Sequence, residues 1–255
     1  MVNRRSEAIG LLTAFALLGA GGCDSSSPTA TGGDPGTDST ILTDQKTANP
    51  PFDAAAFVAG VDNPYLPLLP GTVFHYRSET QDGLETNDVA VTRDGKQILG
   101  VNVTVVHDQV FLDGELSEDT FDWFAQDADG NVWYFGEDSK EIENGQVVST
   151  EGSWEAGVGA NEPGIIMLAH PKVGLAYHQE SAPDIAEDMA RVLSLKASPE
   201  VPYGSFDNCV GTMEWSLIEH GVREHKSYCP GVGLVLEDQP KGGHIRNELD
   251  SISHF

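Results

Sequence analysis

The chain has 255 residues and a mass of 27.3 kDa, a length typical of one domain with an additional terminal segment. It contains 40 Asp and Glu residues against 14 Lys and Arg residues, which gives a formal net charge of −26. A surface with this charge repels phosphate groups, so nucleic acids and anionic lipid headgroups are poor partners. With 39% hydrophobic residues and a mean hydropathy of −0.25, most of the chain is apolar enough to fold.

Residues 1–22 have the features of a secretory signal peptide. Arg4 and Arg5 precede a stretch of apolar and small residues from Ala8 to Ala20 that is too short to span a bilayer. The small residues before Cys23 resemble a bacterial lipobox, which implies a lipid anchor such as palmitate on this cysteine. We therefore expect export and attachment to the outer side of the cytoplasmic membrane or to the outer membrane. Leu usually occupies the position of Ala20, and an ordinary cleaved signal peptide is the alternative.

Residues 23–51 predict a flexible linker behind this anchor. Ser, Thr, Gly, Pro and Asp dominate the segment, and it holds too few apolar residues to offset the entropy lost on ordering. A coil of this length reaches roughly 30 Å from its attachment point. The linker is therefore expected to hold a folded domain, residues 52–255, away from the membrane.

Short runs of β-forming residues separated by turn dipeptides indicate that this domain is mainly β. A short Ala-rich stretch from Asp53 to Ala59 favours a helical turn or two before them. Five dipeptides supply the positive φ angles that tight hairpins require: Asp82-Gly83, Asp94-Gly95, Asp113-Gly114, Asp129-Gly130 and Asn144-Gly145. The strands predicted between them are Thr72–Ser78, Asp88–Thr92, Gln97–His107, Glu115–Ala125, Asn131–Glu137 and Gln146–Thr150.

The second half of the domain predicts further strands with two interruptions. The apolar segment Gly164–Tyr177 contains Pro171 and Gly174, which favours a loop or short turn. Residues Pro183–Ala190 are expected to begin a helix, because acidic residues lie near its positive end. The later strands are expected at Arg191–Lys196, Asp207–Ile218, Val222–Tyr228, Val232–Asp238 and His244–Ser251.

Aromatic residues of this sheet are candidate ligand-binding residues. Trp123 and Trp133 lie on strands joined by a predicted hairpin, where cross-strand aromatic rings pack well, and Trp154 follows them along the chain. Core packing is the more common role for such residues, and stacking on an apolar ligand is the alternative.

Cys209 and Cys229 flank a predicted hairpin whose turn is Glu219-His220-Gly221. The midpoint of the two cysteine positions is residue 219, so the cysteines lie nearly opposite each other. In an oxidising exported setting this arrangement predicts a disulfide, and two buried free thiols are the alternative. A loop of about 21 residues closed in this way contributes roughly 3 kcal/mol.

Motifs of enzymes and metal sites are weak or missing, and we expect no cofactor, no metal and no catalytic residue. Asp127–Asp138 superficially matches a calcium loop, but Val132 occupies the position of the required glycine, which favours a hairpin turn. His220 and His225 have a spacing that suits neither a helix face nor one strand face. No Gly-x-Ser-x-Gly, His-Glu-x-x-His, Walker or Gly-x-Gly-x-x-Gly motif occurs.

Three stretches resemble sequences of uncharacterised bacterial exported lipoproteins, similar to the lipoprotein-carrier half-barrels of the LolA and LppX type. They are Asn63–Thr72, Val201–Cys209 and Tyr228–Val235. The resemblance implies a curved antiparallel sheet, or half-barrel, with one or two short helices or loops at its mouth. It covers most of residues 63–238 and implies no catalytic residues.

The function predicted first is a cell-envelope binding module that holds an apolar ligand, a lipid or a partner segment against Trp123, Trp133 and Trp154. The first alternative is a structural or interaction lipoprotein whose acidic surface binds cations or a cationic partner. The second alternative is an extracellular hydrolase with a site among His107, His170, His178, His220 and His225.

Overall fold

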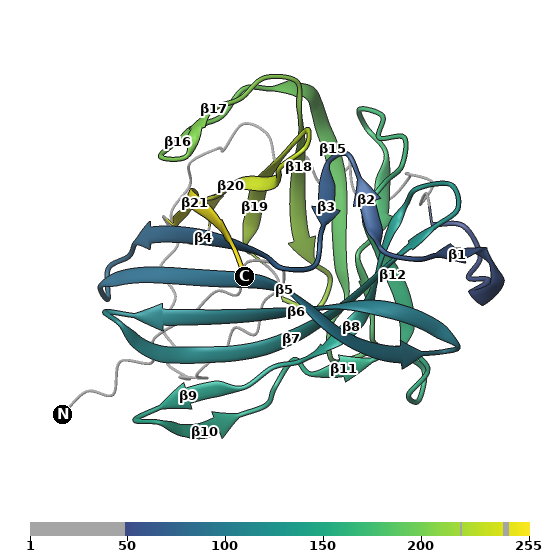
Figure 1. Cartoon of the computed structure of the whole chain (residues 1–255), viewed down its shortest axis with the longest axis horizontal. Coiled ribbons are helices and arrows are strands. Elements are labelled where there is room, and N and C mark those ends of the chain that lie inside the picture. Colours follow the sequence, from purple (N-terminus) through teal and green to yellow (C-terminus); the bar gives the residue numbers. More distant parts are fainter. Residues whose placement is uncertain (1–48, 220, 242–244) are drawn as a thin grey trace, which may run out of the picture.

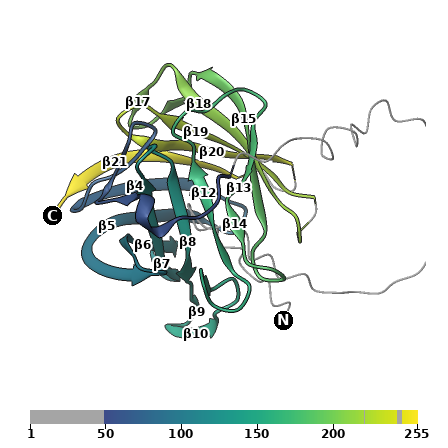
Figure 2. The same cartoon turned by 90° about the vertical axis from the view of Figure 1, so that its right-hand side faces the viewer.

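The computed structural model describes residues 49–219, 221–241 and 245–255. Apart from one 3-10 turn, η1 (Ala54–Ala56), the elements of this part of the chain are β-strands. Seventeen strands belong to one antiparallel sheet, which curves into a nearly closed barrel (Figures 1 and 2). The predicted curved antiparallel sheet is confirmed, and the sheet continues beyond a half-barrel until its ends meet.

The barrel is built from thirteen strands that follow one another around the ring, and pairing of the last strand with the first long strand connects its ends. Their bounds are β4 (Thr72–Glu79), β5 (Leu84–Ile98), β6 (Val101–Leu112), β7 (Glu115–Asp127), β8 (Val132–Asp138), β12 (Glu162–Met167), β13 (Ala176–His178), β14 (Glu180–Ser181), β15 (Asp188–Ala197), β18 (Cys209–Ser216), β19 (Arg223–Cys229), β20 (Gly233–Lys241) and β21 (Arg246–His254).

Further short strands lie at the ends of this barrel. They are β1 (Phe57–Val58), β2 (Val61–Asn63), β3 (Leu66–Leu68), β9 (Glu141–Glu143), β10 (Gln146–Ser149), β11 (Trp154–Glu155), β16 (Glu200–Val201) and β17 (Gly204–Ser205). The hairpin of β2 and β3 lies in front of the barrel in Figure 1, and β1 pairs with the end of β7.

The weakest junction in the ring lies between β12 and β14, which we call the seam. Only Glu162–Ser181 and Pro163–Glu180 pair there, whereas β5 and β6 share eleven register pairs. Proline has no backbone N–H to donate, so one of the two seam pairs is further weakened. The two sides of the seam also approach closely: a Cβ atom on Gly164 would lie 2.1 Å from the carbonyl oxygen of Gln179.

One face of each long strand is buried and points into the barrel, because side chains alternate across a strand. In β4 this face carries Thr72, Phe74, Tyr76 and Ser78, and its other residues are more exposed. The interior changes character along the strands, since β7 carries Glu118, Thr120 and Asp122 on the face that ends in Phe124. The barrel therefore encloses an apolar region and a polar region.

Two local predictions are wrong and a third holds only in part, because tertiary pairing overrides a local pattern. No helix forms over Pro183–Ala190: Ala182 and Ala186 form a β-bridge, and β15 begins at Asp188. The loop and turn predicted for Gly164–Tyr177 are present around Pro171 and Gly174. The first residues of this segment instead belong to β12, which is buried on both faces and so shows no alternation.

The second wrong prediction concerns the hairpin at Asp94-Gly95. These residues interrupt the register of β5 instead, and the β5–β6 hairpin turns at Leu99 and Gly100, where φ is 50° and 84°. As a result β5 is one long strand, and β6 begins later than expected.

The other hairpin turns and the disulfide are confirmed. Asp113-Gly114 and Asn144-Gly145 have positive φ angles at both residues. Cys209 and Cys229 form a disulfide at the outer ends of β18 and β19, with a Cα–Cα distance of 4.3 Å. Counting from the turn therefore gave the correct register for this hairpin, although His220 in the turn lies outside the described residues.

Candidate functional site

The three tryptophans named as ligand-binding residues are all buried and lie in separate surroundings. Trp123 is covered by the Nζ atom of Lys96, 3.1 Å from the ring centroid. Trp133 donates a hydrogen bond to Asp127 at 2.8 Å. Trp154 lies edge-on to Tyr134, with ring centroids 5.7 Å apart. The structure does not bring the three rings together, and Cys23 lies outside the described residues.

The described histidines do not gather into one site. His107 forms a 2.7 Å contact with Asp119 on the neighbouring strand and stacks on Phe121. His178 is on β13, whereas His225 is exposed on β19. Within the described ranges, no three His, Cys, Asp or Glu side chains are arranged to hold a metal ion. No helix in the same ranges is long and apolar enough to cross a membrane.

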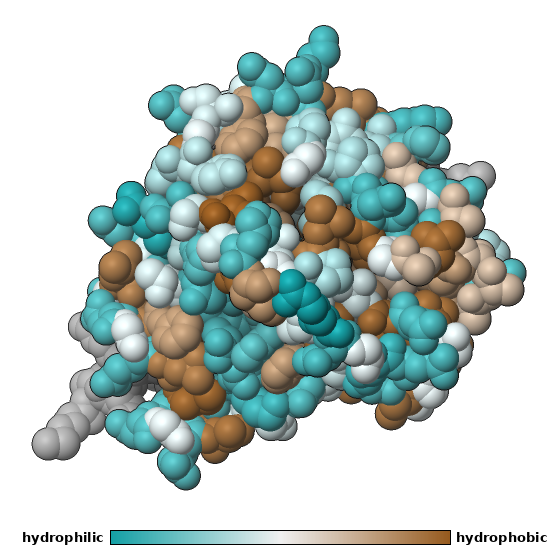
Figure 3. Space-filling model, in the orientation of Figure 1, coloured by the Kyte–Doolittle hydropathy of each residue, from teal (hydrophilic) through white to brown (hydrophobic). Residues whose placement is uncertain are grey.

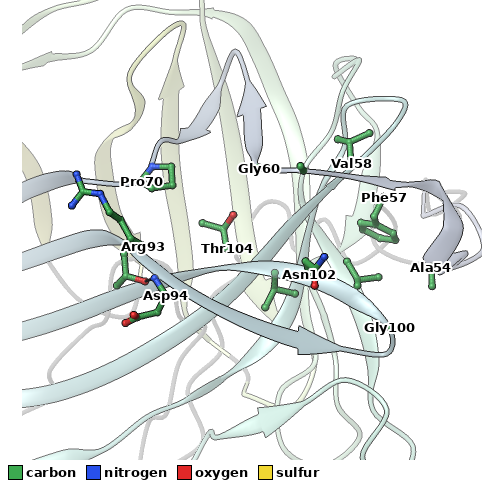
Figure 4. A pocket seen from close by; sticks show the side chains of 14 residues that line it. Ala54, Phe57, Val58, Gly60, Pro70, Arg93, Asp94, Gly100, Asn102 and Thr104 are labelled. Carbon is green, nitrogen blue, oxygen red and sulfur yellow. Dashed lines mark hydrogen bonds between the residues drawn. The ribbon is translucent and has the colours of Figure 1, made fainter.

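A groove of about 360 Å³ lies between the η1–β1 segment and the β5–β6 hairpin (Figure 4). Phe57 bounds it on one side, and Arg93 and Asp94 lie on the other. The Arg93 guanidinium is already engaged, because it donates to the carbonyl oxygen of Phe255 at 2.5 Å and covers the Phe255 ring. The groove thus has few free polar groups that converge on a ligand.

A stronger candidate lies inside the barrel, where acidic side chains are concentrated. In the described part of the chain eleven Asp and Glu side chains are buried, against one buried lysine and one buried arginine. Arg191 lies on the outer face of β15 over Trp215, and Asp127 bonds to Asn131 and Trp133 at the end of β7. The remaining ten carboxyl groups face the interior: Glu85, Asp108, Glu118, Asp122, Glu137, Glu180, Asp188, Glu214, Glu224 and Glu237.

The interior lysine is surrounded by three of these acids, a group that we call the lysine cluster. The Nζ atom of Lys226 lies 3.2 Å from Glu214, 3.2 Å from Glu224 and 3.8 Å from Glu237. Burial alone would lower the pKa of Lys226, but the three acids outweigh it and raise this pKa above its usual value. Burial, followed by Glu224, raises the pKa of Glu237 well above its usual value. The lysine cluster therefore contains three carboxyl groups and one ammonium group, which can balance the charge of only one of them.

Hydroxyl groups complete the hydrogen bonding of Glu214. Thr212 donates to Oε1 of Glu214 at 2.7 Å, and the Tyr228 hydroxyl donates to the same atom at 3.2 Å. Lys226 binds the other carboxylate oxygen. A buried carboxylate in this fold is therefore satisfied when an ammonium group and hydroxyl donors meet it.

A second group of acids lies on β5, β6 and β7. Thr120 donates to Oε1 of Glu118 at 2.9 Å, and Asn87 donates to Asp108. Burial, followed by the charge of Asp108, raises the pKa of Glu118 to about 8 and that of Glu85 to about 7. Both carboxyl groups therefore hold protons at a pH where exposed glutamates have lost them.

A third group lies beside the seam. Tyr134 donates to Oδ1 of Asp122 at 2.6 Å, and Asp122 pairs with Glu137 across β7 and β8. Burial raises the pKa values of Asp122, Glu137 and Glu180 well above their usual ranges. Neighbouring acids act in the same direction: Asp108 on Asp122, Glu180 on Glu137, and Asp188 on Glu180. On the adjoining strand, burial raises the pKa of Asp188 to about 7.

Sequence reasoning missed this acidic interior because it assigned the acidic surplus to solvated surface. The face shown in Figure 3 is indeed largely hydrophilic, with apolar groups interrupted by polar side chains. The available signal was alternation: Glu118, Thr120 and Asp122 occupy every second position of a strand, as do Glu224, Lys226 and Tyr228. Such a polar row in phase with buried aromatic residues indicates a polar interior.

Comparison with known proteins gives no assignment for this arrangement: no family model, no curated protein and no solved structure matches the chain.

Proposed function

We propose that this protein is an exported binding module whose barrel interior binds a small ligand that carries a positive charge. The observation that carries the proposal is the imbalance of the interior, where ten carboxyl groups face one ammonium group among the described residues. Barrels are a common framework for enclosing one small ligand. A cation would supply the charge that this interior lacks.

The chemistry of the interior favours a cationic ligand over the apolar ligand expected from the tryptophans. An apolar molecule would cover buried carboxyl groups without hydrogen-bonding them, which is costly. A cation instead pairs with them, as Lys226 pairs with Glu214 and Glu224 at 3.2 Å. We therefore keep the binding module predicted from the sequence and replace its apolar ligand with a cationic one.

Export and anchoring through Cys23 belong to the proposal as predictions from the sequence. They place the barrel at the cell envelope, tethered by residues 23–51. Cys23→Ser is expected to move the protein from the membrane fraction to the soluble fraction of disrupted cells. Retention of the variant in the membrane fraction would count against the lipid anchor.

The ligand class is tested by thermal unfolding of the mature protein at pH 8 and pH 5. The additives are n-butylammonium chloride, calcium chloride, sodium chloride at matched ionic strength, and 1-butanol. At pH 8 a cation that binds the folded state raises Tm by an amount that grows with the logarithm of its concentration above Kd, and sodium chloride controls for screening. At pH 5 the effect should shrink, because Glu85, Glu118 and Asp188, whose pKa values are raised to about 7 or 8, hold protons there.

Two results would contradict the proposal. Stabilisation by 1-butanol equal to that by n-butylammonium would indicate an apolar site. Equal shifts with sodium chloride and with the other two salts would indicate screening of the acidic surface, as expected for the alternative in which that surface docks a cationic partner.

A further inference from the structure

Three carboxyl groups and one indole converge beside the seam, and we call Asp122, Glu137, Glu180 and Trp154 the seam cluster. Asp122 and Trp154 both pair with Glu137, from the neighbouring strands β7 and β11, so the three side chains share one face of the sheet. Glu180 lies on β14, opposite Pro163 of the strand that pairs with β8. The four side chains thus come from four strands and meet at the weakest junction of the barrel.

Polar atoms of the seam cluster are buried without hydrogen-bond partners. They are Oδ2 of Asp122, Oε2 of Glu137, both carboxyl oxygens of Glu180 and Nε1 of Trp154. The exposed fractions of Glu180 and Trp154 are only 2% and 4%. The Trp154 N–H lies close enough to favour the charged form of Glu180, but it forms no hydrogen bond of accepted geometry. Buried polar atoms in folded proteins nearly always have hydrogen-bond partners, so the seam cluster lacks partners that the described residues do not supply.

The lysine cluster shows what is lacking. It also contains three carboxyl groups, and the Lys226 ammonium lies within 3.8 Å of all three. In the described part of the chain, no Lys or Arg forms an ion pair with Asp122, Glu137 or Glu180. The seam cluster therefore repeats the acidic half of the lysine cluster without its ammonium group.

The surroundings favour an organic ammonium over a metal ion. The rings of Trp154 and Tyr134 lie edge to face at 5.7 Å beside the carboxyl groups, and an ammonium group gains from aromatic faces as well as from carboxylates. A calcium ion requires six to eight oxygens at short range, and the described acids offer no metal-binding arrangement.

We propose, building on the function proposed above, that the seam cluster binds the ammonium group of a small organic amine, which reaches it by local opening of the seam. The seam has two register pairs, one of them at Pro163, so it is the part of the ring that opens at the lowest cost. Glu180 lies on the moving edge and is the first of the three acids to be exposed.

Binding of the amine is coupled to release of a proton. The acids of the free cluster hold their protons to a higher pH than exposed carboxyl groups do, because burial raises the pKa of each. An amine that enters as R–NH3+ displaces the carboxyl proton of Glu180 to solvent and leaves an ammonium–carboxylate pair. The charged and titratable groups that face the three acids are Asp108, Glu118, Tyr134, Asp188 and Lys226. Of these groups, Glu118 and Asp188 favour a bound cation once they have lost their protons, and Lys226 opposes it.

Isothermal titration calorimetry on the mature full-length protein tests the site. The probes are n-butylammonium chloride, the size-matched neutral 1-butanol, and calcium chloride, each at pH 6, 7 and 8 in two buffers of different ionisation enthalpy. We expect n-butylammonium to bind with proton release, with an affinity that rises up to about tenfold per pH unit, and we expect no heat from 1-butanol.

Matched variants locate the site. Glu180→Gln keeps the shape of the protonated side chain and should weaken n-butylammonium binding about tenfold or more, since a buried charged contact is lost. Glu162→Gln removes an exposed carboxylate from the facing strand and should leave the affinity unchanged. Unchanged circular dichroism and unfolding of Glu180→Gln at pH 5 would establish that this variant folds.

The outcomes separate this inference from the proposed function. Amine binding that is unaffected by Glu180→Gln but weakened by Glu214→Gln would overturn the seam site and leave a cation-binding barrel. Binding of calcium without binding of amine would overturn the ligand class of the seam. Binding of neither cation by the wild-type protein would overturn both.

Discussion

Glu118 provides the sharpest test of the acidic interior, because one substitution imitates its protonated form. In Glu118→Gln the amide keeps an oxygen that accepts the 2.9 Å hydrogen bond from Thr120, and its nitrogen replaces the protonated oxygen. The substitution therefore removes a titrating group from the barrel while preserving its size and contacts.

The expected magnitude follows from the pKa of Glu118, which burial and Asp108 raise from 4.5 to about 8. The folded chain holds a proton between these two pH values that the unfolded chain releases. Stabilisation from this proton is complete below pH 4.5 and is lost as the pH rises through 8. At about 1.4 kcal/mol per pH unit, the wild type should lose on the order of 5 kcal/mol relative to Glu118→Gln across this range.

The measurement is the free energy of unfolding in urea at pH 4.5, 6, 7 and 8, at constant ionic strength. Glu118→Gln should differ little from the wild type at pH 4.5 and become progressively the more stable protein as the pH rises above 4.5. Glu115→Gln, an exposed position on the same strand, should follow the wild type throughout. A difference between Glu118→Gln and wild type that stays constant with pH would show that Glu118 is ionised in the folded protein, and would refute the reasoning.

Two further predictions concern the lysine cluster and the seam. Lys226→Met leaves Glu214, Glu224 and Glu237 buried without their ammonium group, so it should destabilise the protein by about 3–5 kcal/mol at pH 8. The loss should be smaller at pH 5, because the raised pKa of Glu237 favours its neutral form as the pH falls. Equal losses in urea unfolding at both pH values would contradict this. Gly164→Ala would place a Cβ atom 2.1 Å from the carbonyl oxygen of Gln179, so it should lower the free energy of unfolding by about 1–3 kcal/mol. In the control variant Gly95→Ala the new Cβ atom meets no atom within 4 Å, so this change should be nearly neutral in the same assay. Equal effects of the two changes would argue against close contact at the seam.

Local chemistry made part of the fold predictable. The turn at Asp113-Gly114 requires positive φ angles that few residue pairs adopt easily, so the sequence alone marks its position. The disulfide followed from the same kind of reasoning, because the turn of a hairpin determines which residues lie opposite one another, and this pairs Cys209 with Cys229.

Features that depend on distant parts of the chain were not predictable. Closure of the barrel pairs β21 with β4, and no local pattern in either strand specifies its partner. Strand β12 is buried on both faces, so it lacks the alternation by which strands are recognised. Pro183–Ala190 has the composition of a helix start, but Asp188 and Ala190 are required on the buried face of β15.

The candidate site was not predicted, because an acidic strand face has the same sequence pattern whether it points to solvent or into a barrel. Glu118, Thr120 and Asp122 would suit a solvated surface as well as an interior. Only the burial of Phe124 in phase with them shows that this face points inward. Trp154 was named for its aromatic ring, and the structure adds an unpaired indole N–H beside Glu180.

The acidic interior also changes what the net charge of −26 means. That value counts every Asp and Glu as ionised, whereas seven of the interior acids have raised pKa values: Glu85, Glu118, Asp122, Glu137, Glu180, Asp188 and Glu237. Near neutral pH part of the acidic surplus is therefore stored as protonated carboxyl groups inside the barrel. Such groups destabilise the fold as they ionise, so a barrel that retains them gains stability from any cation that replaces their protons. Lys226 already does so for one cluster within the chain, and this leaves the seam cluster as the place where a cation from outside the chain has the most to contribute.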